Sequence, residues 1–251
     1  MSKLIVLLST CLLLFSCQSP KNRPLNIATA ANMQFAMKAL IEDFSLQTGI
    51  ECEMVTSSSG KLTAQIIEGA PYDIFVAANM KYPKAIFDAG LGEKSPQIYA
   101  LGKLVLWSAK EEKHIDLTES TWSTVSHIAV ANPKTAPYGE AAIHALQQLE
   151  IYDELENKLV FGESISQTNQ FILSGVAELG FTAMSVVKSP AMKSKGAWIK
   201  VPDSLYQSIE QGVILIKKEE GNSENASKFY EFLFSQKAHE ILKEYGYEIP
   251  A

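Results

Sequence analysis

Short apolar runs of strand length alternate with stretches of helical periodicity along most of this sequence. The first run covers residues 25–28, and apolar side chains at helical spacing follow it over residues 33–44. Residues 52–55 and the helical stripe that ends near Gly69 repeat the pattern. A strand, a helix and a second strand in this order predict a parallel sheet covered by helices. The sequence therefore predicts an α/β protein.

The same alternation continues towards the end of the chain. Further strand-length runs lie at residues 73–78, 104–107, 127–130, 158–161, 179–182 and 212–216, and two helices are expected over 222–245. No repeat of fixed period and no low-complexity linker divides the sequence into independent domains. We therefore expect a single chain that crosses twice between two lobes and leaves a ligand cleft between them.

Two polar turns lie where the first two strand-length runs give way to helices. The first contains Asn32, and the second contains Ser59. Parallel strands end at one edge of a sheet, where open α/β folds bind ligands. Helix starts at that edge offer unpaired N–H groups and a positive dipole end. Asn and Ser are also the preferred N-cap residues, so each turn taken alone is better explained by capping, and only the two together make a site an equal alternative. Together the turns predict an anion site with uncharged donors.

The charge balance limits the classes of ligand. The formal net charge is −6, and no basic stripe interrupts the sequence. Binding to a nucleic-acid backbone is therefore not expected. The overall field does not attract an anion either, so its affinity has to come from local donors.

The first 17 residues have the features of an export signal. Lys3 gives a positive start, residues 4–15 form an apolar core too short to span a membrane, and Ser16 precedes Cys17. Residues 14–17 resemble the lipobox of bacterial lipoproteins, although Phe15 is uncommon there. An ordinary secretory signal cleaved nearby is the alternative. We expect an exported chain, periplasmic or at the cell surface, with Cys17 as the lipid attachment site and only anchor, and residues 18–24 as a short tether.

No catalytic or metal-binding motif accompanies these features. The sequence has no Gly-x-Ser-x-Gly elbow, no Walker-type phosphate loop and no zinc motif. Its four histidines are scattered and lack ligand spacing. We therefore expect neither an enzyme nor a cofactor. An adhesion or structural lipoprotein that binds no small anion is the alternative from another class.

Several motifs resemble the molybdate-binding proteins of ABC transporters, in order and at similar spacing over essentially all of the mature chain. They lie at residues 28–37, 57–60, 69–78, 131–133, 137–139, 179–181 and 245–247. The resemblance implies a two-lobed periplasmic-binding-protein fold of type II, with a mainly parallel, helix-flanked sheet in each lobe. We expect residues 25–101 and 214–251 to form lobe 1 and residues 102–213 to form lobe 2.

The resemblance also implies five oxyanion-binding positions. In lobe 1 they fall on Asn32 and Ser59, and in lobe 2 on Tyr138 and the backbone N–H of Ile165. The fifth falls on Ala183, where many members carry a tyrosine that reaches the anion. Tyr138 stands where many members carry alanine, so we hypothesise that its phenol replaces the missing one. Simple packing in a Pro-Gly turn is the alternative role for Tyr138.

The function implied by the resemblance is capture of molybdate, and of tungstate of nearly the same size. The metal would enter only as the oxyanion, without direct protein ligands. Delivery to a membrane permease and its ATPase would follow, and the binding protein would act as a monomer. Sulfate or another tetrahedral oxyanion is the alternative ligand. Iron is less expected, because no pair of adjacent tyrosines lies in the predicted cleft loops.

Overall fold

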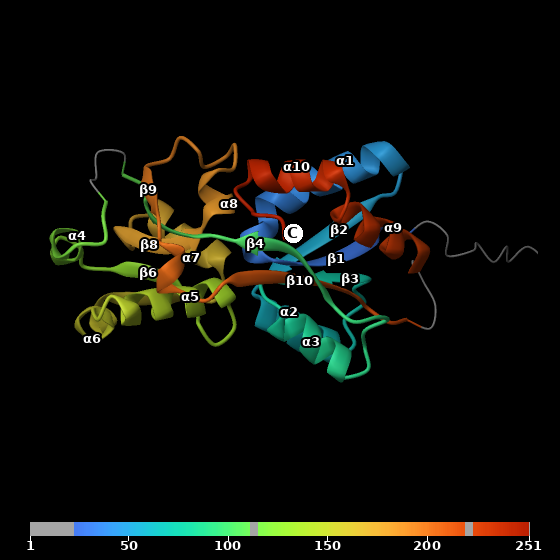
Figure 1. The fold of residues 1–251 in the computed structure, drawn as a ribbon, viewed down its shortest axis with the longest axis horizontal. Helices are drawn as coiled ribbons and strands as arrows, with labels where there is room; N and C mark the ends of the chain where they lie inside the picture. The colour runs from blue at the N-terminus through green and yellow to red at the C-terminus, as the bar shows by residue number, and fades with distance from the viewer. Residues whose placement is uncertain (1–22, 111–114, 219–222, 251) are drawn as a thin grey trace, which may run out of the picture.

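The computed structural model describes residues 23–110, 115–218 and 223–250. They form two lobes that lie next to one another along the longest axis of the molecule (Figure 1). Each lobe contains one five-stranded sheet with helices on its faces. The α/β, two-lobed fold expected from the sequence is thus confirmed. The predicted signal segment with Cys17, and most of the predicted tether, lie outside the described residues.

The sheet of lobe 1 has the strand order β2-β1-β3-β10-β4. These strands are β1 (Leu25–Ala30), β2 (Cys52–Ser57), β3 (Ile74–Val76), β4 (Gln97–Gly102) and β10 (Ile209–Leu215). β1 pairs in parallel with β2 and β3, whereas β10 is antiparallel to both of its neighbours. β4 therefore runs in the same direction as β1, β2 and β3. Only β10 runs against the other strands, so the sheet is mainly parallel.

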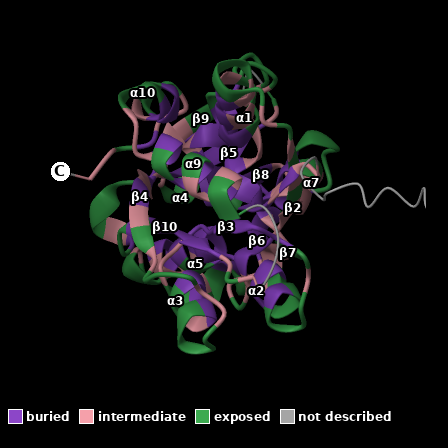
Figure 2. Cartoon of the chain, turned by 90° about the vertical axis from the view of Figure 1, so that its right-hand side faces the viewer, coloured by how far each residue is buried: buried purple, intermediate pink, exposed green. Residues whose placement is uncertain are grey.

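Helices cover both faces of this sheet. One face carries α1 (Gln34–Thr48), α9 (Ser223–Leu233) and α10 (Gln236–Glu244), and the other carries α2 (Ser59–Ile67) and α3 (Lys81–Asp88) (Figure 1). A separate buried apolar cluster lies under each group of helices. Figure 2 shows the central strands mainly buried and the outward faces of these helices exposed. Burial of the apolar helix stripes on both faces of the sheet therefore holds lobe 1 together.

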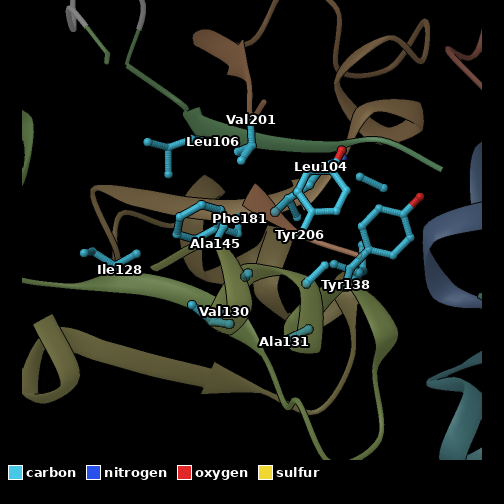
Figure 3. Close-up of a cluster of buried hydrophobic side chains, with 14 of the residues drawn as sticks. Leu104, Leu106, Ile128, Val130, Ala131, Tyr138, Ala145, Phe181, Val201 and Tyr206 are labelled. Carbon is cyan, nitrogen blue, oxygen red and sulfur yellow. The ribbon is translucent and has the colours of Figure 1, made fainter. Parts of the chain in front are cut away.

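The sheet of lobe 2 repeats this arrangement in the order β7-β6-β8-β5-β9. Its strands are β5 (Leu104–Ser108), β6 (Ile128–Ala131), β7 (Leu159–Gly162), β8 (Leu179–Ala183) and β9 (Ala197–Lys200). Its α-helices are α4 (Glu119–Ser123), α5 (Pro137–Gln148), α6 (Tyr152–Leu155), α7 (Ile165–Leu173) and α8 (Met184–Val187). β6 pairs in parallel with β7 and β8, and β5 is the reversed strand. The main core lies between this sheet and α5 (Figure 3).

The chain crosses between the lobes twice, as expected. The first crossing runs from β4 through Lys103 into β5, and the second follows β9 and contains the 3-10 helix η4 (Asp203–Leu205). The predicted lobe boundary after residue 213 needs a correction, because all of β10 belongs to the sheet of lobe 1. The apolar signal of β10 starts late, since exposed Glu210 and buried Gln211 interrupt it before a bulge.

The segment after α10 returns to the first crossing strand. Leu101 and Glu248 exchange two backbone hydrogen bonds, from the Leu101 N–H at 2.7 Å and from the Glu248 N–H at 3.0 Å. This bridge holds the buried side chain of Tyr247 against the junction of the lobes. Within the described residues, no helix is both long enough and apolar enough to cross a bilayer.

Candidate functional site

A small cavity lies between the lobes at the point where several helices begin. Its walls are formed in lobe 1 by Ala30, Ala31, Asn32, Ser58, Ser59 and Ala78, and in lobe 2 by Ala136, Pro137, Tyr138 and Ile165. The 3-10 helix η2 (Ala31–Met33) and the helices α2, α5 and α7 all start at this cavity. First-turn N–H groups lack intrahelical partners and carry the positive end of the helix dipole. Four helix starts therefore border one small space between the lobes.

Ser59 offers its hydroxyl proton to this cavity. It is the first residue of α2 and is 1 % exposed. Its Oγ accepts a hydrogen bond from the Ala78 N–H at 3.0 Å, so the hydroxyl proton remains available for a ligand. The capping role belongs to Ser58, whose Oγ accepts from the Lys61 N–H at 3.4 Å. Capping therefore does not explain the position of Ser59.

Asn32 is the central residue of η2 and is 1 % exposed. Its side chain makes no capping hydrogen bond. Ser185 Oγ and Tyr247 Oη donate to its backbone carbonyl at 2.7 and 3.3 Å. Its carboxamide Nδ2 donates to Gln211 Oε1 at 2.8 Å and to Tyr247 Oη at 3.1 Å. Buried polar side chains thus hold both the backbone carbonyl and the side-chain amide of Asn32.

Lobe 2 contributes backbone donors from two helix starts. Pro137 occupies the first turn of α5 without an N–H, so the N–H of Tyr138 is the first that this helix can offer. Ile165 begins α7, whose N-cap Ser164 accepts from the Gln167 N–H at 3.5 Å. The structure therefore brings Asn32, Ser59, Tyr138 and Ile165 together around one cavity.

The phenol of Tyr138 is directed towards the crossing strands. Its ring lies at one end of the lobe 2 core, near Tyr206 (Figure 3). Gln211 Nε2 donates to its hydroxyl oxygen at 3.4 Å, and a Cβ on Gly102 would lie only 2.1 Å from that oxygen. Gly102 is therefore required for the close approach of the strand. The hypothesis that this phenol also reaches the anion stays a prediction.

Ala183 occupies a different environment from the other four positions. It is the last residue of β8, pairs with Leu104 and is fully buried in the lobe 2 core. The residues that line the cavity do not include it. Its methyl group has no hydrogen-bonding capacity, so it offers the anion no donor.

The sequence analysis missed a buried polar network next to the cavity. It joins Asn32 to Gln211 of β10, Tyr99 of β4, Tyr138 and Tyr247. Burial raises the pKa of Tyr247 to about 12 and raises the pKa of Tyr99 and Tyr138 well above its usual value. All three hydroxyls are therefore protonated and uncharged near neutral pH.

The cavity walls carry no charged side chain among their lining residues. Lys61, two residues after Ser59, pairs through its Nζ with Glu163 of lobe 2 at 2.5 Å, and both side chains are exposed. No group of three or more His, Cys, Asp or Glu side chains able to hold a metal ion lies within the described residues. The groups that line the cavity are therefore uncharged.

Contacts between the lobes surround the cavity. The Gly60 N–H donates to the Thr135 carbonyl at 2.9 Å. Ser166 Oγ donates to Gln34 Oε1 at 3.0 Å, and Tyr82 Oη donates to the Lys134 carbonyl at 3.2 Å. These bonds join α1, α2 and α3 to loops and helices of lobe 2. The structure is therefore a closed form, in which donors from both lobes face one small space.

Comparison with known proteins agrees with this geometry. Residues 25–248 match the family described as bacterial extracellular solute-binding protein. The molybdate-binding protein ModA of Azotobacter vinelandii is 36 % identical over 252 residues, which cover 98 % of this chain and 97 % of that protein. The molybdate-binding protein ModA of Rhodobacter capsulatus is 39 % identical over 222 residues, which cover 88 % and 86 %.

A solved structure supports the same assignment. The periplasmic molybdate-binding protein of Azotobacter vinelandii superposes with a TM-score of 0.85 and 34 % identity, over 90 % of this chain and 100 % of that chain. The fold is thus that of periplasmic binding proteins, and these relatives are binding proteins rather than enzymes. The chain belongs to the bacterial extracellular solute-binding proteins, in the family that includes the molybdate-binding proteins of Azotobacter vinelandii and Rhodobacter capsulatus.

Proposed function

We propose that this protein captures molybdate, and tungstate of nearly the same size, outside the cytoplasm and delivers it to an ABC permease and its ATPase. The observation that carries the proposal is the convergence of uncharged donors from four helix starts on one cavity between two lobes. The names of the relatives supply the identity of the anion.

The donors that we assign to the anion come from both lobes. Lobe 1 supplies the Ser59 hydroxyl and the N–H groups at the start of η2, including that of Asn32. Lobe 2 supplies the N–H groups of Tyr138 and Ile165. Burying a dianion is costly unless its oxygens are hydrogen-bonded. Each bond to a charged group contributes about 1.5–3 kcal/mol, so about half a dozen such bonds give a tight site.

A site made only of donors also selects among oxyanions. Hydrogen phosphate retains a proton near neutral pH and needs an acceptor, which backbone N–H groups cannot provide. Sulfate carries no proton but is smaller than molybdate, so the same donors would lie too far from its oxygens. Unpaired or stretched donors lower the affinity for the wrong anion. We therefore expect molybdate and tungstate to bind in preference to sulfate and phosphate.

Thermal unfolding of the chain from residue 18 onward tests the proposal. Molybdate, tungstate, sulfate and phosphate are each added in excess to separate samples. A ligand at about 1,000 times its Kd stabilises the folded state by about 4 kcal/mol, which at this size raises Tm by on the order of ten degrees. We expect this rise with molybdate and tungstate, and a smaller rise in Ser59→Ala, which lacks one of the assigned donors.

Two results would contradict the proposal. A rise in Tm with sulfate alone would assign the cavity to a different oxyanion. No rise with any of the four anions would leave a fold of binding proteins without an anion site, and an adhesion or structural role would then be favoured.

We also propose that the mature chain is a monomer held at the membrane by a lipid on Cys17. The support is the lipobox-like order Leu14-Phe15-Ser16-Cys17 after an apolar core. Metabolic labelling of expressing bacteria with a radioactive fatty acid should label the natural chain and not Cys17→Ser. Equal labelling of both chains, or of neither, would reject the anchor.

A further inference from the structure

The carboxamide of Asn32 uses its donors away from the anion site. Its two N–H groups are directed to Gln211 Oε1 at 2.8 Å and Tyr247 Oη at 3.1 Å. No described residue donates a hydrogen bond to its Oδ1, although Asn32 lines the cavity. In this orientation the group left for a ligand is an acceptor. An oxyanion without a proton requires a donor at the same place.

Rotation of a carboxamide by 180° exchanges its nitrogen and its oxygen at nearly the same positions. If the Asn32 amide turned in this way, Nδ2 would face the cavity and Oδ1 would face Gln211 and Tyr247. Gln211 would then have to donate where it now accepts, which its own amide can do by turning as well. The two amides are therefore coupled.

The surrounding hydroxyls permit this exchange. The four bonds concerned join Asn32 to Gln211, Asn32 to Tyr247, Gln211 to Tyr99 at 3.0 Å, and Gln211 to Tyr138 at 3.4 Å. Every partner beyond the two amides is a tyrosine hydroxyl, which can donate or accept. The raised pKa of each tyrosine keeps its proton in place at neutral pH. The three bonds of Gln211 thus each have a counterpart with donor and acceptor exchanged. In the Asn32–Tyr247 bond, the Tyr247 proton would turn to Asn32 Oδ1 from its present acceptors, Ser185 Oγ at 2.9 Å and the Asn32 carbonyl at 3.3 Å. The Asn32 carbonyl would keep its hydrogen bond from Ser185 Oγ at 2.7 Å.

We propose that Gln211 is a positioning and specificity-determining residue, which turns together with Asn32 so that the Asn32 amide donates to a bound oxyanion. This inference rests on the proposed function, because it concerns the same anion site. Gln211 itself does not line the cavity; it acts through Asn32. In the turned arrangement Gln211 Nε2 donates to Asn32 Oδ1 and holds the Asn32 donors towards the anion.

The consequence is a lower affinity for anions that carry a proton. When Gln211 holds Asn32 as a donor, hydrogen phosphate meets one more N–H and finds no acceptor for its proton. Without Gln211, the Asn32 amide can direct either its oxygen or its nitrogen to the anion with little difference in free energy. Molybdate binding then weakens, while hydrogen phosphate binding does not weaken to the same extent. Hydrogen phosphate and molybdate are both dianions, so a change of charge alone would affect them equally.

The test compares Gln211→Met with the natural chain by titration calorimetry and by competition with hydrogen phosphate at pH 8. Methionine keeps the length of the side chain and removes the amide. Loss of one charge-assisted bond should weaken molybdate binding by about 10- to 100-fold. The ratio of the two dissociation constants, Kd for hydrogen phosphate over Kd for molybdate, should fall by about tenfold.

Tyr206→Phe is the matched control at the same junction of the lobes. Its hydroxyl accepts from the Leu104 N–H at 3.2 Å and donates to Asp203 at 2.8 Å, so it makes no bond to Asn32 or Gln211. This variant loses a buried hydroxyl but should keep both affinities and their ratio. If Gln211→Met kept the ratio of the natural chain, or lowered both affinities equally, the inference would be overturned.

Nuclear Overhauser effects provide a second readout that does not depend on a variant's stability. The Gln211 side-chain amide protons, identified by their loss in Gln211→Met, should be nearer the Tyr138 ring without molybdate and nearer the Tyr99 ring with saturating molybdate. Unchanged contacts would overturn the turning of the amides. Failure of the natural chain to bind molybdate at all would instead overturn the proposed function, and this inference with it.

Discussion

Ser58 and Ser59 are adjacent in sequence, yet their hydroxyls have different partners. Ser58 caps α2, whereas Ser59 accepts from the Ala78 N–H and keeps its proton for the cavity. The sequence could predict the turn and its residue types, because hydroxyl residues before a helix are recognisable. It could not decide which serine is the cap, since that depends on the contact with Ala78, which follows the end of β3.

Replacing Ser59 with alanine should weaken molybdate binding by about 1–3 kcal/mol, through loss of one charge-assisted hydrogen bond. Titration calorimetry measures this difference. Ser235→Ala is the control, because Ser235 Oγ caps α10 by accepting from the Ala238 N–H at 3.2 Å, away from the site. It should lower the free energy of unfolding by about 1 kcal/mol and leave the affinity unchanged. Unchanged affinity in Ser59→Ala would remove Ser59 from the site.

The hypothesis for the Tyr138 phenol has an equally direct test. Tyr138→Phe keeps the ring and the backbone N–H and removes only the hydroxyl, which now accepts from Gln211. If the phenol replaces the one missing at Ala183, molybdate affinity should fall by about tenfold. Binding as tight as that of the natural chain would mean that Tyr138 contributes its backbone alone.

At the scale of elements, the sequence predicted eight of the ten strands that the structure describes. The central strands β1, β6 and β8 are buried and mostly apolar, which the alternation pattern detects. The edge strands β2 and β7 were predicted as well, whereas the edge strands β4 and β9, of mixed composition and partly exposed, were not. The start of β10 was missed for a related reason. Its pairing with β4 depends on a partner more than 100 residues away in the chain, which no local pattern records.

The second crossing between the lobes is held by a small charged cluster. Asp203 of η4 accepts from Lys103 at 3.0 Å and from Lys200 at 2.8 Å, and Tyr206 donates to it at 2.8 Å. Burial alone would raise the pKa of Asp203, but the bonds from Lys200, Tyr206 and Lys103 outweigh it and lower the pKa to about 2. The carboxylate therefore fastens the start of this crossing to β5 and β9.

This lowered pKa gives a pH dependence of defined sign. The folded state binds the Asp203 proton less readily than the unfolded state, so the carboxylate stabilises the fold above about pH 4. That contribution is lost as the pH falls from about 4 to about 2. Because the cluster is partly exposed, Asp203→Asn should cost only about 1 kcal/mol at pH 7. The difference in the free energy of unfolding should shrink as the pH falls below 4 and vanish only below the folded-state pKa of about 2. A difference that stayed constant over this range would have another cause.

For the whole molecule, the decisive feature is contact between the lobes at the start of α2. A Cβ on Gly60 would lie 3.0 Å from Thr135 Cα, closer than an ordinary contact. Gly60 is therefore one of the points where the backbones of the two lobes approach closely. Closure of this kind assembles donors that neither lobe holds alone.

Gly60→Ala should separate closure from stability. Alanine favours a helix over glycine by about 0.5–1 kcal/mol, so Tm without ligand should stay or rise. The closed form becomes less populated, and a tenfold lower population raises the apparent Kd for molybdate by about tenfold. Lys61→Ala, which removes only the exposed pair with Glu163, should change the affinity less than about fivefold. Equal affinity in Gly60→Ala would show that this contact does not limit closure.

The buried network can form only late in the synthesis and export of the chain. Asn32 emerges early from the ribosome and from the export machinery, whereas its partners Gln211 and Tyr247 follow 179 and 215 residues later. A chain that is only half delivered can form the first strands of lobe 1 but not the bonds that fix Asn32. The proposed anion site is therefore completed only when nearly the whole polypeptide is present.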